Sequence, residues 1–216
     1  MNKLKVLGAG CALMVSTSAL AAEQDITIQS KPLQVVTADG KTHALATCGD
    51  YVSLRENPAQ ISSIHGLSER DNVEAHDSLI QCNIQNYVKQ HQLVLDSRAK
   101  VPGIERVVAH FPASAALAVS DDEVEHLKAK GQEKTLQEWT PSLVLKDGRM
   151  ISDKAHVAYV VSQYQVFKSP EGKPLAFITL GSAVTGGTLG VLSTYRIDDM
   201  KGKIWAVTAV TENTAL

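Results

Sequence analysis

Four runs near the C-terminus indicate the fold class: VAYVVSQYQVF (157–167), LAFITLG (175–181), VLSTYRI (191–197) and IWAVTAV (204–210). Each run is rich in β-branched and aromatic residues, and turn residues separate the runs, which is typical of consecutive strands. Both alternating sets are apolar at 157–161, so we expect this strand to be central and covered on both faces. The sequence therefore predicts an antiparallel meander over the C-terminal part of the chain.

Helix signals dominate the segment before these runs. Ser68 or Asp71 can cap a helix that extends to about Gln92, because apolar residues recur there at three- and four-residue spacing. Ser120 and Glu123 have the spacing of a capping box, which predicts a second helix ending at Gly131. Between these two helices, residues 104–110 are rich in β-branched side chains and are expected to form a strand.

The N-terminal part opens with strands. Residues 26–29 and 33–37 are β-like, and the Asp39-Gly40 turn favours a hairpin into 43–48. Residues 49–57 show no regular pattern, and Asn57-Pro58 predicts a short helix through Ile64 that stops at Gly66.

The order of strands, helices and then a sheet indicates an α+β fold, with helices packed on a curved, cone-like antiparallel sheet and an N-terminal β-hairpin. We expect three parts: a signal peptide at 1–21, the hairpin and short helix at 22–66, and the α+β domain at 67–216.

The first residues have the pattern of a secretory signal peptide. Lys3 and Lys5 precede an apolar run at 6–15 that is too short to span a bilayer, and Ala19-Leu20-Ala21 supplies the small-residue cleavage site. Cleavage is expected after Ala21 or one residue later. The sequence thus predicts a periplasmic or secreted protein.

Charge argues against two classes of partner. Cleavage at this site removes two lysines and leaves 19 Lys and Arg against 23 Asp and Glu, a formal charge of −4. No basic cluster is available for nucleic acid or for an anionic membrane surface, and no second apolar run is long enough to span a bilayer. We expect neither a nucleic-acid partner nor a membrane span.

Cleavage also removes Cys11 and leaves Cys48 and Cys82. In an oxidising compartment these two thiols are expected to form a disulfide, the alternative being two separately buried thiols. They are not a C-x-x-C pair, so a thioredoxin-like redox role is not indicated.

The C-terminal part resembles the nuclear transport factor 2-like superfamily, which includes ketosteroid isomerases and scytalone dehydratases. The resemblance rests on DKAHVAYV (153–160), the hairpin with Gly172, TYRID (194–198) and GKIWAV (202–207), and it spans about 71–210. It implies a helix-covered curved sheet with an apolar pocket. It transfers no catalytic residue, because 93–140 does not match the pattern of those enzymes.

Four residues on the expected strands are candidates for a site. His156 and Tyr159 are candidate catalytic residues, since a histidine and a tyrosine together can polarise a carbonyl or move a proton. Tyr159, Tyr164 and Trp205 are candidate ligand-binding residues, and aromatic packing is the alternative for all of them. The histidines are scattered without metal-ligand spacing, and the glycines of 181–190 lack the phosphate-loop ending, so no metal or cofactor is predicted.

Three functions remain open on the sequence alone. The first is an exported, non-catalytic protein that binds a small apolar molecule or another exported protein. The second is an isomerase- or dehydratase-like enzyme that uses His156 and Tyr159. The third is an immunity or inhibitor protein directed against a secreted toxin. The sequence leaves the oligomeric state undetermined.

Overall fold

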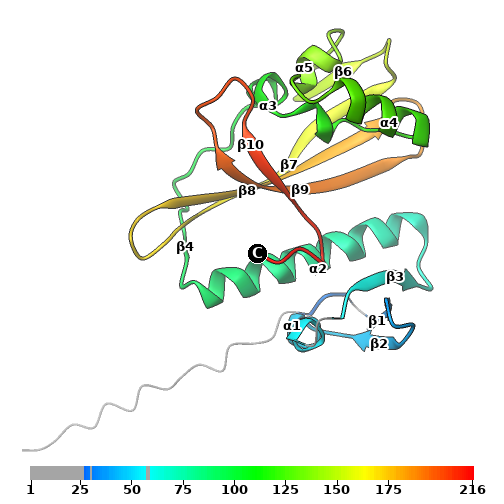
Figure 1. The fold of residues 1–216 in the computed structure, drawn as a ribbon, viewed down its shortest axis with the longest axis vertical. Helices are drawn as coiled ribbons and strands as arrows, with labels where there is room; N and C mark the ends of the chain where they lie inside the picture. The colour runs from blue at the N-terminus through cyan, green and yellow to red at the C-terminus, as the bar shows by residue number, and fades with distance from the viewer. Residues whose placement is uncertain (1–26, 30, 57–58) are drawn as a thin grey trace, which may run out of the picture.

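The predicted C-terminal meander forms one open antiparallel sheet (Figure 1). In the computed structural model, which describes residues 27–29, 31–56 and 59–216, the strand order is β10-β9-β8-β7-β6-β5. The strands are β5 (Val144–Lys146), β6 (Arg149–Ser152), β7 (Val157–Lys168), β8 (Pro174–Val184), β9 (Gly190–Asp199) and β10 (Ala206–Val210). A short strand, β4 (Val94–Leu95), pairs with the far end of β7.

The long strand β7 is central, because β8 pairs with one edge while β6 and β4 pair with the other. A register shift between Val161 and Gln163 inserts one extra residue, Ser162. Such a bulge bends the strand and increases its twist. Because side chains alternate along each strand, Tyr159 and Ile178 lie on one face of the sheet and Val160 and Phe177 on the other.

Different helices cover the two faces. The helix α2 (Glu69–Gln90) packs Ile80 and Ile84 on one face, against Phe167, Phe177 and Val210. The opposite face is covered by α3 (Ile104–His110), a 3₁₀ turn (Ala113–Ala115), α4 (Asp121–Lys130) and α5 (Leu136–Trp139). The largest buried cluster lies on this second face.

A second, smaller sheet lies on the far side of α2 (Figure 1). It has the order β2-β1-β3, with β1 (Leu33–Thr37), β2 (Thr42–Leu45) and β3 (Ile61–His65), and the helix α1 (Cys48–Glu56) follows β2. Its core packs on Ala75 and Leu79 of α2. The predicted disulfide between Cys48 and Cys82 is confirmed and joins α1 to α2.

The last residues of the chain return to this small unit. The Tyr51 hydroxyl donates to the Glu212 carbonyl at 2.6 Å. The Asn213 side chain accepts from the Ile61 N–H and donates to the Ile61 carbonyl, both at 2.8 Å. Asn83 of α2 donates to the carbonyls of Thr211 and Thr214. The tail therefore ties the small unit, α2 and the large sheet together.

The structure confirms the α+β class, the first hairpin, the long helix capped by Ser68 and the helix capped by Ser120. Three local predictions were wrong. Residues 104–110 form a helix because Ile104, Val107 and Val108 meet the core on one helical face. Residues 48–56 form a helix, although 49–57 were expected to be irregular. Residues 61–65 were expected to belong to a short helix, but they form a strand because they pair with β1.

Some predictions fall outside the described residues. These are the signal peptide with its cleavage site at Ala21, and the Asn57-Pro58 start of the expected short helix. Within the described part of the chain, no helix is both long and apolar enough to cross a bilayer.

Candidate functional site

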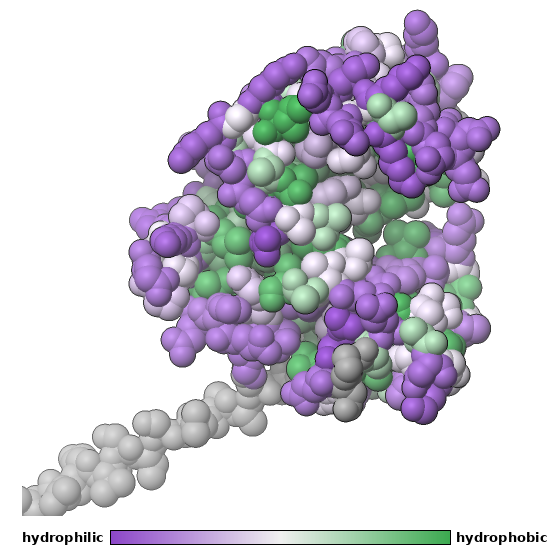
Figure 2. All heavy atoms as spheres, viewed as in Figure 1, coloured by the Kyte–Doolittle hydropathy of each residue, from purple (hydrophilic) through white to green (hydrophobic). Residues whose placement is uncertain are grey.

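A cavity of about 740 Å³ lies between the N-terminal half of α2 and the large sheet. The buried contacts of α2 with this sheet include Ile80 and Ile84, in the second half of the helix. Toward its N-terminus the helix and the sheet are apart, and Figure 2 shows an opening there with apolar atoms on its wall. We call this space the α2 groove.

Small and aliphatic side chains make up the sheet side of the α2 groove. Ala158 lies directly opposite Ala183, and Val160 lies opposite Gly181, so these residues share one face. A Cβ on Gly181 would come within 3.0 Å of the Val160 side chain, so glycine lets Val160 lie over the strand. Leu192 of β9 and Val73 of α2 add apolar surface. The floor of the groove is therefore wide and apolar.

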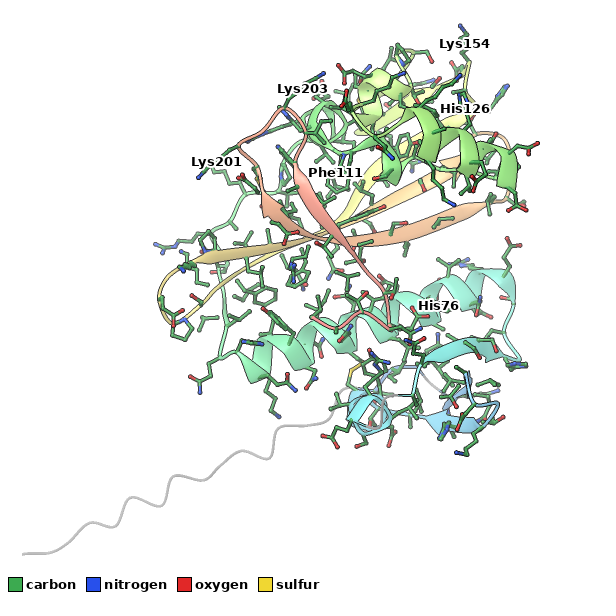
Figure 3. The ribbon with its side chains drawn as sticks, viewed as in Figure 1. His76, Phe111, His126, Lys154, Lys201 and Lys203 are labelled. Atoms are coloured by element: carbon green, nitrogen blue, oxygen red, sulfur yellow. A yellow bond between two sulfur atoms is a disulfide. The ribbon has the colours of Figure 1, made fainter. Side chains whose placement is uncertain are left out.

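A second chamber of about 330 Å³ continues the α2 groove along the helix. The two chambers share Val73, Val191 and Leu192 as lining residues. His76 and Glu212 lie on the wall of the second chamber, and the His76 Nδ1 is 3.2 Å from a Glu212 carboxylate oxygen. Figure 3 shows His76 on α2 beside the C-terminal tail.

The pairing of His76 with Glu212 shifts the pKa values of both side chains. The hydrogen bond that the His76 ring donates to the Glu212 carboxylate raises the pKa of His76, although partial burial opposes the change. Burial alone would raise the pKa of Glu212, but the His76 hydrogen bond, a backbone hydrogen bond and nearby positive charge outweigh it and lower that pKa. Each partner therefore favours the charged form of the other.

His156 and Tyr159 line a separate cavity of about 680 Å³ on the other face of the sheet, beneath α4. His156 is exposed in the turn before β7 and has a positive φ of 51°. Tyr159 is only 2% exposed, and its hydroxyl oxygen accepts from the Leu117 N–H at 3.2 Å. Burial raises the pKa of Tyr159.

Glu123 and His126 of α4 line the same cavity. A Glu123 carboxylate oxygen accepts from the Val119 N–H at 2.7 Å, and the His126 ring lies 5.4 Å from the Trp139 ring. Figure 3 shows His126 on α4, above the end of the sheet. Among the hydrogen bonds of the described residues, none joins His156 to Tyr159 or to Glu123. The two candidates thus share a cavity without forming a hydrogen-bonded pair.

The other two aromatic candidates lie in packing contacts. Trp205 is 2% exposed, meets Phe111 edge-on, stacks with the His110 ring at 5.6 Å and has the Arg106 guanidinium 5.7 Å from its ring centre. Tyr164 packs against the same core cluster, and burial raises its pKa. Neither residue lines the cavities described above, so their role in ligand binding stays a prediction.

Of the residues that line the α2 groove, Tyr159 alone was a candidate from the sequence, and its side chain lies on the opposite face of the sheet. The local signal for the groove is the presence of three small residues, Ala158, Gly181 and Ala183, within two strands of otherwise bulky side chains. Within the described ranges, no group of three or more His, Cys, Asp or Glu side chains is placed to hold a metal ion.

No family model, curated protein or solved structure matches this chain. The resemblance to the nuclear transport factor 2-like superfamily therefore stays a prediction.

Proposed function

We propose that the protein is an exported, non-catalytic binding protein that holds a small apolar ligand in the α2 groove. The observation that carries the proposal is the cavity of about 740 Å³ between the first half of α2 and the sheet. Pockets for small molecules commonly enclose about 300–1,000 Å³ and combine mostly apolar walls with a few polar groups. The α2 groove has this size and this kind of wall.

Export is supported by two independent features. The N-terminal 21 residues have the charge, apolar run and small-residue pattern of a signal peptide. The disulfide between Cys48 and Cys82 forms readily in a periplasmic or extracellular environment and is rare in a reducing cytosol. Both features favour a site of action outside the cytoplasm.

The geometry supports an enzyme less well. General acid–base chemistry needs a base within hydrogen-bond reach of the proton it takes. His156 lies exposed in a turn, while the Tyr159 hydroxyl is buried and already accepts a backbone N–H. In the described part of the chain, no hydrogen bond joins either side chain to a third side chain that would orient a reactive pair.

Binding of a neutral apolar fluorophore, N-phenylnaphthylamine, tests the proposal. The Ala183→Leu variant places four heavy atoms where Ala183 has one, on the floor of the α2 groove, so we expect its affinity to fall about tenfold or more. The matched control is Ala206→Leu, because Ala206 is an exposed strand alanine that lines neither chamber. Circular dichroism spectra check that both variants are folded.

Two results would contradict the proposal. One is a wild-type protein that does not change the fluorescence of the probe. The other is an Ala183→Leu variant that binds the probe as tightly as Ala206→Leu. Stoichiometric capture of another exported protein, with no probe binding, would instead favour a protein partner.

A further inference from the structure

The mouth of the α2 groove carries positive charge on its sheet side. Arg149 begins β6 and lies opposite Lys146 of β5. Its neighbour Met150 lies opposite Tyr159 and is buried in the core on the α4 side, so Arg149 must extend from the α2 side of the sheet. Lys146 extends from the same side, because directly paired residues share a face.

Arg149 is also available to bind a ligand. It lines the 740 Å³ cavity, and no hydrogen bond or ion pair of its guanidinium occurs among the interactions found in the described chain. The other arginine at the mouth, Arg70, is already paired with Glu74 at 3.2 Å. A guanidinium with five free donors matches a carboxylate in a bidentate arrangement.

The N-terminus of α2 adds to the positive potential at the same place. Ser68, Glu69 and Arg70 line the cavity, and the macrodipole of a 22-residue helix puts partial positive charge at this end. Glu69 opposes this effect, since its carboxylate borders the mouth as well. The charged end of the ligand therefore meets one free guanidinium, one helix end, the Arg70–Glu74 pair and the opposing carboxylate of Glu69.

Beyond the mouth the groove is apolar and elongated. It passes Ala158 and Val160 and continues into the second chamber beside the shared lining residues Val73, Val191 and Leu192. A flexible chain of methylenes can follow such a path, and each buried methylene contributes about 0.8 kcal/mol.

We propose that the ligand is a linear aliphatic carboxylic acid, with its carboxylate on Arg149 and its chain along the α2 groove toward the second chamber. This inference rests on the proposed function and adds the chemical class of the ligand. It distinguishes the acid from an alcohol of equal length, which has the same chain but lacks the charge.

Calorimetric titration of the purified protein with dodecanoate and with dodecanol, at neutral pH, tests the inference. We expect the acid to bind about three- to tenfold more tightly than the alcohol, as for a partly exposed charge-assisted hydrogen bond. Arg149→Gln should remove this preference by lowering the affinity for dodecanoate to about that for dodecanol. Glu69→Gln should widen the preference, because it removes the opposing charge.

Arg98→Gln is the control for net charge, since Arg98 is an exposed cation outside both chambers. It should keep the wild-type preference. Equal affinities for acid and alcohol in the wild type, or a preference that survives in Arg149→Gln, would overturn the inference and leave an apolar groove in place. If dodecanoate, dodecanol and the neutral fluorophore all failed to bind the protein, the proposed function itself would be overturned.

Discussion

At the scale of single residues, Asp77 is the least well satisfied charge in the described chain. One of its carboxylate oxygens is buried without a hydrogen-bond partner, and burial raises its pKa although Gln81 opposes the shift. An acid with a raised pKa costs stability when it is ionised, and this cost shrinks as pH falls below the raised pKa and is gone below the ordinary value of 3.8.

We predict that Asp77→Asn stabilises the protein at neutral pH by about 1 kcal/mol, the scale of a removed desolvation penalty. The gain should vanish in acid, where the wild-type carboxyl takes up its proton. Denaturation at a series of pH values measures both effects. Asp153→Asn, at an exposed turn residue, is the control, and a wild type that is the more stable at neutral pH would refute the interpretation.

The His76 and Glu212 pair predicts a different pH dependence. A raised histidine pKa contributes stability below the ordinary value of 6.5, and this contribution is lost as pH rises through the folded-state value. A lowered glutamate pKa contributes above the ordinary value of 4.5 and is lost as pH falls through the folded-state value. The pair therefore stabilises the protein most between pH 4.5 and pH 6.5.

Glu212→Gln should accordingly cost more free energy of unfolding at about pH 5.5 than at about pH 8.5. Urea denaturation at the two pH values measures the difference, and Glu133→Gln, an exposed glutamate, serves as the reference. A loss of the same size at both values would mean that the pair contributes nothing through its charges.

At the scale of elements, α1 begins with a reciprocal cap. The Asp50 N–H donates to the Thr47 hydroxyl at 3.2 Å, and the Thr47 N–H donates to the Asp50 carboxylate at 2.9 Å. We predict that Thr47→Ala destabilises the protein by about 1 kcal/mol, the usual cost of a lost N-cap. Ser53→Ala, in the exposed middle of the same helix, should be neutral or slightly stabilising, and a thermal melt compares the two.

Local sequence reasoning failed at three elements, of which α1 is the first. The Thr47 and Asp50 spacing is typical of a helix start, but the irregular pattern at 49–57 did not predict the helix that follows. The spacing of Ile104, Val107 and Val108 fits one helical face, but adjacent β-branched residues favoured a strand. By contrast, the pairing of 61–65 with β1 is a long-range contact, and nothing local at Ile61 and Ile64 separates helix from strand.

The candidate site was less predictable than the fold. Strand patterns gave the meander, and with it the positions of Ala158, Gly181 and Ala183. The α2 groove exists because one end of α2 lies close to the sheet and the other end does not, and this depends on the angle of packing between elements. No residue type or spacing encodes that angle directly, so the sequence pointed to the aromatic residues instead.

At the scale of the whole molecule, the disulfide between Cys48 and Cys82 links the small sheet unit to α2 across a separation of 34 residues. We predict that Cys48→Ser lowers the free energy of unfolding by about 2–4 kcal/mol, mainly by enlarging the unfolded ensemble. Denaturation with and without reductant measures the loss, and reductant should have no further effect on the variant. A wild type whose midpoint is insensitive to reductant, with the bond shown to be broken, would contradict the prediction.

The side-chain amide of Asn213 has a further consequence for association between molecules. It occupies both the N–H and the C=O of Ile61, at the start of β3, one of the two edge strands of the small sheet. Free groups on such an edge are a template for strand addition by another chain. The tail thus blocks pairing of another strand at Ile61. A molecule whose tail is detached exposes these two backbone groups, which can then pair with a strand of a neighbouring molecule.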